Sequence, residues 1–266
     1  MQIIFFIRGY YRLSRYFVKK NILNPDLLII PLLLVIAFLY SSVGHGGASG
    51  YLGLMVLIGI SPAVMRPSAL LLNLIVSSIA AVQFYRSGYF RINLLIPFVI
   101  LSVPFSFIGA KITLEDPVYK IILGICLLIS VLRMVIINNL SVTSLKNELP
   151  FIPALIAGAC IGLISGMIGI GGGILLSPLL LIFHWADIKE SAAVAAPFIL
   201  VNSLSGIAGL WSSGITFPPQ IFVWIAAASA GGILGSFFGS VKFNTAALKF
   251  LLSAVILVAV VKLILN

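Results

Sequence analysis

The stretch Gly44-His45-Gly46-Gly47-Ala48 lies inside an apolar run and returns as Gly169-Ile170-Gly171-Gly172-Gly173, at an offset of 125 residues. Glycine costs about 1 kcal/mol relative to alanine in a helix interior, so each cluster predicts a point where a helix stops. The repeat extends beyond the clusters, because other pairs share an offset of 125 or 126: Ser78 with Ser203, Gly88 with Gly214, and Gly109 with Gly235. The stretch therefore predicts two homologous halves, each with one broken helix.

Composition defines the broad class. The chain is 61% hydrophobic and only 8% charged, with a mean hydropathy of +1.24, whereas soluble domains carry about 25% charged residues. These values predict an all-α, polytopic membrane protein. The net charge is +10, but the basic residues stand at the ends of apolar segments, which indicates a positive-inside bias rather than binding to nucleic acid.

Apolar runs divide the chain into four parts: 1–25, a first membrane repeat over 26–138, a linker over 139–149 and a second repeat over 150–266. The first part alternates basic and aromatic residues, which favours a helix lying on the membrane surface; a poorly ordered tail is the alternative. Each half holds about four spans plus one short run after its glycines, which suits a half-helix or re-entrant segment. The long runs fall near 27–43, 67–85, 92–111, 118–137, 151–168, 191–211, 219–240 and 247–265, and the short runs near 47–60 and 172–184.

The number of crossings decides how the halves are related. With eight spans, ten of the Lys and Arg residues lie on the cytoplasmic side and six lie outside. With ten spans, nine lie on the cytoplasmic side and seven lie outside. The positive-inside rule therefore favours eight spans and parallel halves, with both termini cytoplasmic. In that arrangement the 138–150 linker is cytoplasmic, and the loops near 111–117 and 184–190 face outward. The alternative is ten spans with inverted repeats.

The glycine motifs carry a family resemblance. The second-half motif, Gly169 to Gly173 with Pro178 five residues on, resembles the TauE/SafE family of membrane anion permeases, and the resemblance covers 27–265. The first half departs from that pattern, with Ala48 in place of a third glycine and Gly53 in place of a proline. The resemblance implies transport of sulfite, sulfonates or related sulfur-containing anions across the cytoplasmic membrane, without a nucleotide-hydrolysing partner.

The chemistry of the breaks is compatible with an anion. Unwinding a membrane helix frees backbone N–H groups, and the helix that restarts after each break presents its positive dipole end. Two such N-termini could hold a small oxyanion without any formal charge from the protein. The alternative is a purely structural role, in which the glycines only let helices pack closely. The predicted substrate-binding residues at the breaks are Gly44, His45, Gly46, Gly47, Ala48, Gly169, Gly171, Gly172 and Gly173.

Polar residues inside the spans extend this site. Asn73 with Ser77, and Asn202 with Ser203, could line a cavity, although interhelical hydrogen bonding is the ordinary role of such residues. His45 could couple transport to protons through its charge, or could simply bond a neighbouring carbonyl. Arg86 could steer anions on the cytoplasmic side, against the default of reaching toward lipid headgroups.

Catalytic chemistry is not indicated. The six acids lie at segment ends or in loops, and no nucleophile–base pair or metal-ligand cluster has a usable spacing. Because a cation transporter usually places an acid inside the membrane, the pattern favours an anionic or neutral substrate. We therefore expect a secondary transporter in the cell membrane, with no enzyme activity, cofactor or metal, and with the lipid bilayer as its surroundings. The alternatives are an anion channel and a non-transporting membrane anchor or assembly module.

Overall fold

The structure is a computed structural model, and it describes residues 25–42, 46–86, 88–136, 147–215, 217–239 and 256–263. These residues form helices and short connections, with no strand among them, which agrees with the all-α expectation. The predicted surface helix at 1–25 lies almost wholly outside the described residues. The helices are α2 Pro25–Ser42, α3 Ala48–Ile58, α4 Pro62–Arg86, α5 Ile92–Lys111, α6 Asp116–Ile136, α7 Phe151–Ile168, α8 Gly173–Ile182, α9 Ile188–Ser212 and α10 Ile221–Gly239, followed by a helix at 256–263.

Helix lengths follow the sequence repeat. Helices α2 and α7 have 18 residues each, and α4 and α9 have 25 each. The segments after the glycine clusters are short, with 11 residues in α3 and 10 in α8. On length and composition, and within the described part of the chain, four helices could cross a membrane: α4, α5, α7 and α9.

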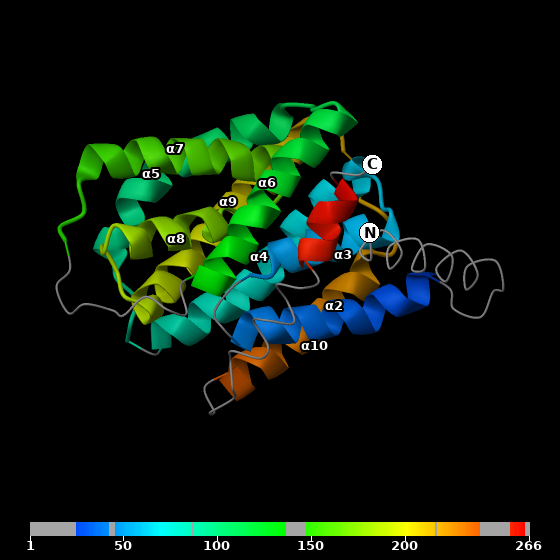
Figure 1. Cartoon of the computed structure of the whole chain (residues 1–266), viewed down its shortest axis with the longest axis horizontal. Helices are drawn as coiled ribbons and strands as arrows, with labels where there is room; N and C mark the ends of the chain where they lie inside the picture. The colour runs from blue at the N-terminus through cyan, green and yellow to red at the C-terminus, as the bar shows by residue number, and fades with distance from the viewer. Residues whose placement is uncertain are drawn as a thin grey trace, which may run out of the picture.

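Two pairs of helices pack through glycine seams. On α7, Gly158, Gly162 and Gly166 lie directly against backbone carbonyls of α5, and no side chain fits between these helices. Helix α10 meets α2 in the same way, with Gly231 and Gly235 against carbonyls of α2. Figure 1 shows α7 along the upper edge, α2 with α10 along the lower edge, and α4 and α9 between them.

Hydrogen bonds define the two ends of the bundle. At the end where α4 begins and α5 ends, here called end A, the buried Arg66 donates to the carbonyls of Gly166, Gly109, Ala110 and Ile112. This guanidinium satisfies the last carbonyls of α5 and α7, where the helix dipoles are negative. Tyr119 of α6 adds a 3.0 Å bond to the Ile168 carbonyl.

The opposite end, here called end B, holds the starts of α5, α7 and α9. Asn147 donates its backbone N–H to the His184 carbonyl at 3.0 Å, and Arg91 pairs with the buried Glu190 at 2.8 Å. Glu190 also closes a capping box with Asp187 at the start of α9. End B therefore gathers the end of the linker and the connection that precedes α9.

The two broken helices form hairpins that enter from opposite ends. Helix α7 runs from end B to end A, and α8 turns back beside α9 to end B, with Ser191 bonding the Ser177 carbonyl. Helix α2 runs parallel to α10, which begins at end A, and α3 returns to end A, where Lys262 donates to the Leu57 carbonyl. The chain thus enters the first half at end A and the second half at end B.

This arrangement corrects the eight-span expectation in one respect. That expectation put the 138–150 linker and the 184–190 loop on opposite faces, whereas the Asn147–His184 bond puts the described end of the linker and the start of that loop together at end B. The physical reason is that α8 doubles back along α9, so the break and its short helix return the chain to the end from which α7 started. The number of basic residues on each side of the membrane, on which the eight-span expectation rests, does not report that α8 reverses the direction of the chain.

Candidate anion-binding site between two helix breaks

The first break ends at Gly46 and Gly47. Gly47 has a φ of 87° and precedes α3 without any side-chain cap, so the first turn of α3 keeps its N–H groups free of side-chain acceptors. A Cβ at Gly47 would lie 2.7 Å from the hydroxyl oxygen of Tyr51. Ala48 opens α3 and is buried. The predicted site residues Gly44 and His45 lie outside the described residues.

The second break repeats this construction. Gly169, Gly171 and Gly172 have φ values of 83°, 75° and 78°, a region that L-residues with side chains rarely adopt. Gly172 precedes α8, again without a side-chain cap, and Gly173 opens α8 and is buried. Both breaks therefore end in an uncapped helix N-terminus, where the dipole is positive.

The breaks meet at the middle of α4 and α9. A Cβ on Gly46 would lie 3.4 Å from Asn73 Oδ1 and 3.1 Å from Ile199 Cγ2. A Cβ on Gly171 would lie 2.9 Å from Asn73 Nδ2 and 3.2 Å from Ser203 Oγ. Asn73 of α4 thus touches both breaks, and α9 supplies Ser203 and Ile199. The structure brings together residues that are more than 120 positions apart in the sequence.

Several polar atoms at the breaks have no hydrogen-bond partner within the part of the chain that the structure describes. Both amide atoms of Asn73, the Ser203 hydroxyl and the Tyr51 hydroxyl are buried, and each lacks a partner among the described residues. Buried polar groups are almost always paired, because an unpaired one costs about 1–3 kcal/mol. Their gathering beside two uncapped helix N-termini marks a place where a bound group could supply the missing bonds.

Tyr51 is a site residue that the sequence analysis missed. It lies one turn into α3, where its ring packs over Gly47. Within an apolar helix, a tyrosine is most simply explained as part of the core, so only its place just after the break could have singled it out. Its hydroxyl lies against Gly47 of the first break and is the third of these unpartnered side chains; we call Tyr51, Asn73 and Ser203 together the break cluster.

Other predicted residues lie elsewhere. Asn202 faces α5, because its Nδ2 donates to Ser102 Oγ of α5 at 3.0 Å. The same Nδ2 also donates to the Phe198 carbonyl, one turn earlier on α9, at 2.9 Å. The Ser77 hydroxyl lies 3.5 Å from the Leu74 carbonyl of its own helix. Gly169 packs against the backbone of Arg66, toward end A. Arg86 ends α4 on the exposed surface, at the opposite end of that helix from Arg66.

The break cluster contains only neutral side chains. The buried cation on α4 is Arg66, which lies seven residues before Asn73, or about 10 Å along the helix. Its guanidinium donates to four backbone carbonyls at the ends of α5 and α7. Among the described residues, the break cluster thus offers an amide and two hydroxyls, beside the N–H groups of two helix N-termini. Such a set suits an acceptor-rich, negatively charged group.

These features define an α-helical, multi-pass membrane protein with two helix breaks facing each other at its centre. The chain matches the sequence model of the sulfite exporter TauE/SafE family over residues 29–263, and it belongs to that family. It is also 36% identical over 233 residues to the probable membrane transporter protein y4hK of Sinorhizobium fredii (strain NBRC 101917 / NGR234), covering 86% of this chain and 94% of that protein. No solved structure matches the chain. The resemblance drawn from the glycine motifs is confirmed, and the protein is a membrane transporter.

Proposed function

We propose that the protein is a secondary carrier of small anions, with sulfite, sulfonates or related sulfur-containing anions as substrates, bound at the break cluster. One observation carries the proposal: Asn73, beside both breaks, and Ser203, beside the second, are fully buried, yet their polar side-chain atoms lack partners among the described residues. Bound oxyanions would accept from the Asn73 amide N–H, from the hydroxyls and from the backbone N–H groups of α3 and α8.

The opposed hairpins support a carrier mechanism. The α2–α3 hairpin begins and ends at end A, and the α7–α8 hairpin begins and ends at end B. Each hairpin could therefore expose the same central site to a different face of the membrane. Inverted repeats with a midplane site are a common basis for alternating access. We therefore propose ten crossings and inverted halves, with α3 and α8 counted as short crossings. End A is then cytoplasmic, together with both termini, and the protein resides in the cell membrane.

Flux through a reconstituted membrane tests the transport proposal. Purified protein in liposomes should take up radiolabelled sulfite, and unlabelled sulfite inside the vesicles should accelerate that uptake, because a carrier returns faster when loaded. Empty liposomes provide the control. Uptake without acceleration would indicate an anion channel, and no uptake of sulfite or of any sulfonate tested would indicate an anchor or assembly module; either result would overturn the carrier proposal.

A further inference from the structure

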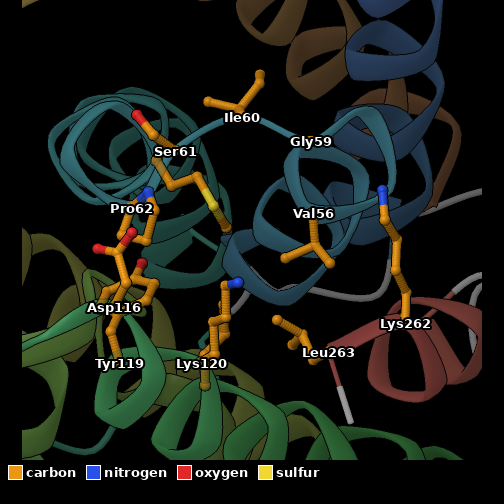
Figure 2. Close-up of a pocket in the computed structure, with 12 residues that line it drawn as sticks. Val56, Gly59, Ile60, Ser61, Pro62, Asp116, Tyr119, Lys120, Lys262 and Leu263 are labelled. Atoms are coloured by element: carbon orange, nitrogen blue, oxygen red, sulfur yellow. The ribbon is translucent and has the colours of Figure 1, made fainter. Parts of the chain in front are cut away.

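A second cavity lies at end A, away from the break cluster. It has a volume of 560 Å³ and lies between the end of α3, the start of α4, the start of α6 and the helix at 256–263 (Figure 2). Helix α3 separates it from the first break, and its 11 residues span about 16 Å. The cavity and the break cluster are therefore separate places, and one small anion cannot contact both. Its volume falls within the range of about 300–1,000 Å³ typical of small-molecule sites.

The walls of this end-A cavity combine apolar and charged groups. Val56, Met65 and Leu123 contribute apolar surface from three different helices. Three charged residues, Asp116, Lys120 and Lys262, also line the cavity. Two lysines and one aspartate give the walls an excess of one positive charge.

The charged groups are not equivalent. Lys262 donates to the Leu57 carbonyl at 3.0 Å, so its ammonium is engaged at the carboxyl end of α3. Lys120 projects from α6 into the space between α3 and the start of α4, as Figure 2 shows. It forms no hydrogen bond or ion pair with any part of the chain that the structure describes, although it is half-buried. A half-buried cation without a partner attracts an anion more strongly than a fully hydrated one does.

We propose that the end-A cavity is a second binding site, which takes an amphiphilic anion. The acidic group of the ligand pairs with Lys120, and its carbon chain covers Val56, Met65 and Leu123. This chemistry belongs both to free organic acids, such as alkane sulfonates, and to anionic lipid headgroups with the first part of their chains. The site goes beyond the proposed transport function, because it needs no contact with the breaks.

Binding of two sulfonates to the purified, full-length protein tests this site. Hexanesulfonate and methanesulfonate share one acidic group and differ in the carbon chain. Hexanesulfonate should bind more tightly to the parent by about tenfold or more, since each buried CH₂ contributes about 0.8 kcal/mol. Lys120→Gln should weaken hexanesulfonate binding by about tenfold. Lys111→Gln is the matched control, because Lys111 lies exposed at the same end of the bundle, outside the cavity.

Two further measurements distinguish this site from the break cluster and show whether its ligand is a lipid headgroup or a free organic anion. Asn73→Asp should leave unchanged the part of hexanesulfonate binding that Lys120→Gln removes, whatever it does to sulfite transport and to sulfonate binding at the break cluster. Nanodiscs of phosphatidylcholine with and without phosphatidylglycerol distinguish the ligands: competition by phosphatidylglycerol in the parent but not in Lys120→Gln indicates a lipid headgroup, and its absence indicates a free organic anion. Equal binding by Lys120→Gln and Lys111→Gln, or loss of the Lys120-dependent binding in Asn73→Asp, would overturn the proposal.

Discussion

Asn73 joins the two halves of the protein at the scale of a single residue. Its Oδ1 faces Gly46 and its Nδ2 faces Gly171, so one side chain of α4 contacts both breaks. Its counterpart at an offset of 126 is Ile199, which also contacts both glycines. The centre is therefore polar on the α4 side and partly apolar on the α9 side. Because Asn73 and Ile199 are not alike, the two halves contribute differently to one site.

Gly171 should tolerate no side chain, both because of backbone strain and because of a clash with Asn73, and a control variant can separate these two effects. Its φ of 75° strains any L-residue, and a Cβ there would lie 2.9 Å from Asn73 Nδ2. Gly171→Ala should therefore abolish the rise in melting temperature that sulfite produces. Gly214→Ala is the control, because Gly214 has a φ of 76° with nothing within 4 Å of a Cβ. Loss of the sulfite effect in both variants to the same extent would assign it to backbone strain alone.

His45 remains a prediction from the sequence, since it lies outside the described residues. Imidazole is the side chain whose unperturbed pKa, about 6.5, places a change of charge between pH 5 and 8. His45→Gln should flatten the pH dependence of sulfite uptake between pH 5 and 8 and lower the uptake rate on the acidic side. His184→Gln should behave like the parent. An uptake profile of His45→Gln that overlays the parent profile would show that this histidine does not couple transport to protons.

At the scale of helices, the glycine seams determine which elements move together. The carbonyls of Phe98, Ser102 and Ser106 lie against Gly158, Gly162 and Gly166 of α7, so α5 and α7 contact each other backbone to backbone. Helices α2 and α10 are joined in the same manner. We infer that each pair behaves as one rigid unit, with α4 and α9 packed between the pairs.

A pair of alanine substitutions tests the seam between α5 and α7. A Cβ on Gly162 would collide with the backbone of Ser102, so Gly162→Ala should lower stability by about 1–3 kcal/mol. A Cβ on Gly124 of α6 would meet only Leu263 at 3.9 Å, so Gly124→Ala should raise helix stability by up to about 1 kcal/mol. Melting temperatures in detergent compare the two. A Gly162→Ala protein as stable as the parent would contradict close packing at the seam.

Much of the helical layout could be predicted from the sequence, and the misses have physical causes. The expected spans at 92–111 and 151–168 coincide with α5 and α7, and the short runs after the glycines became α3 and α8. Helix α9 begins earlier than its apolar run, because the capping box of Asp187 and Glu190 extends the helix into polar sequence. Among the residues that the structure gathers at the breaks, the glycines, Asn73 and Ser203 could be singled out from the sequence, because polar and flexible residues stand out in apolar helices. Tyr51 could not, because a tyrosine in an apolar helix is most simply explained as part of the core.

At the scale of the whole molecule, the direction of the second half could not be predicted from charge. The eight- and ten-span arrangements differ by one basic residue on each side of the membrane. The structure adds contacts between distant segments, which group Arg66 and Tyr119 at end A, and Asn147 and His184 at end B. These contacts place α2–α3 and α7–α8 in opposite orientations within the bundle of Figure 1.

Labelling of single cysteines in intact cells tests this orientation. In a background lacking Cys126 and Cys160, a cysteine replacing Glu148 at end B should react with a membrane-impermeant thiol reagent. A cysteine replacing Glu115 at end A should resist it, because end A is proposed to be cytoplasmic. Both positions are exposed in the structure, so access to the reagent is the variable that differs. The eight-span arrangement gives the reverse result, with Glu115→Cys labelled and Glu148→Cys protected.

The central claim is that an anion binds between the two breaks, and sulfite binding to variants of the break cluster tests it most directly. A ligand at one hundred times its Kd stabilises a protein by about 2.7 kcal/mol, so sulfite should raise the melting temperature of the parent. Asn73→Asp keeps the size of the side chain but adds a negative charge, and Ser203→Ala removes one donor. We predict no sulfite effect in Asn73→Asp and a weakened effect in Ser203→Ala. Ser78→Ala is the control and should respond like the parent, because the Ser78 hydroxyl bonds the Leu74 carbonyl of its own helix. A folded Asn73→Asp protein that sulfite stabilises as much as the parent would contradict the account.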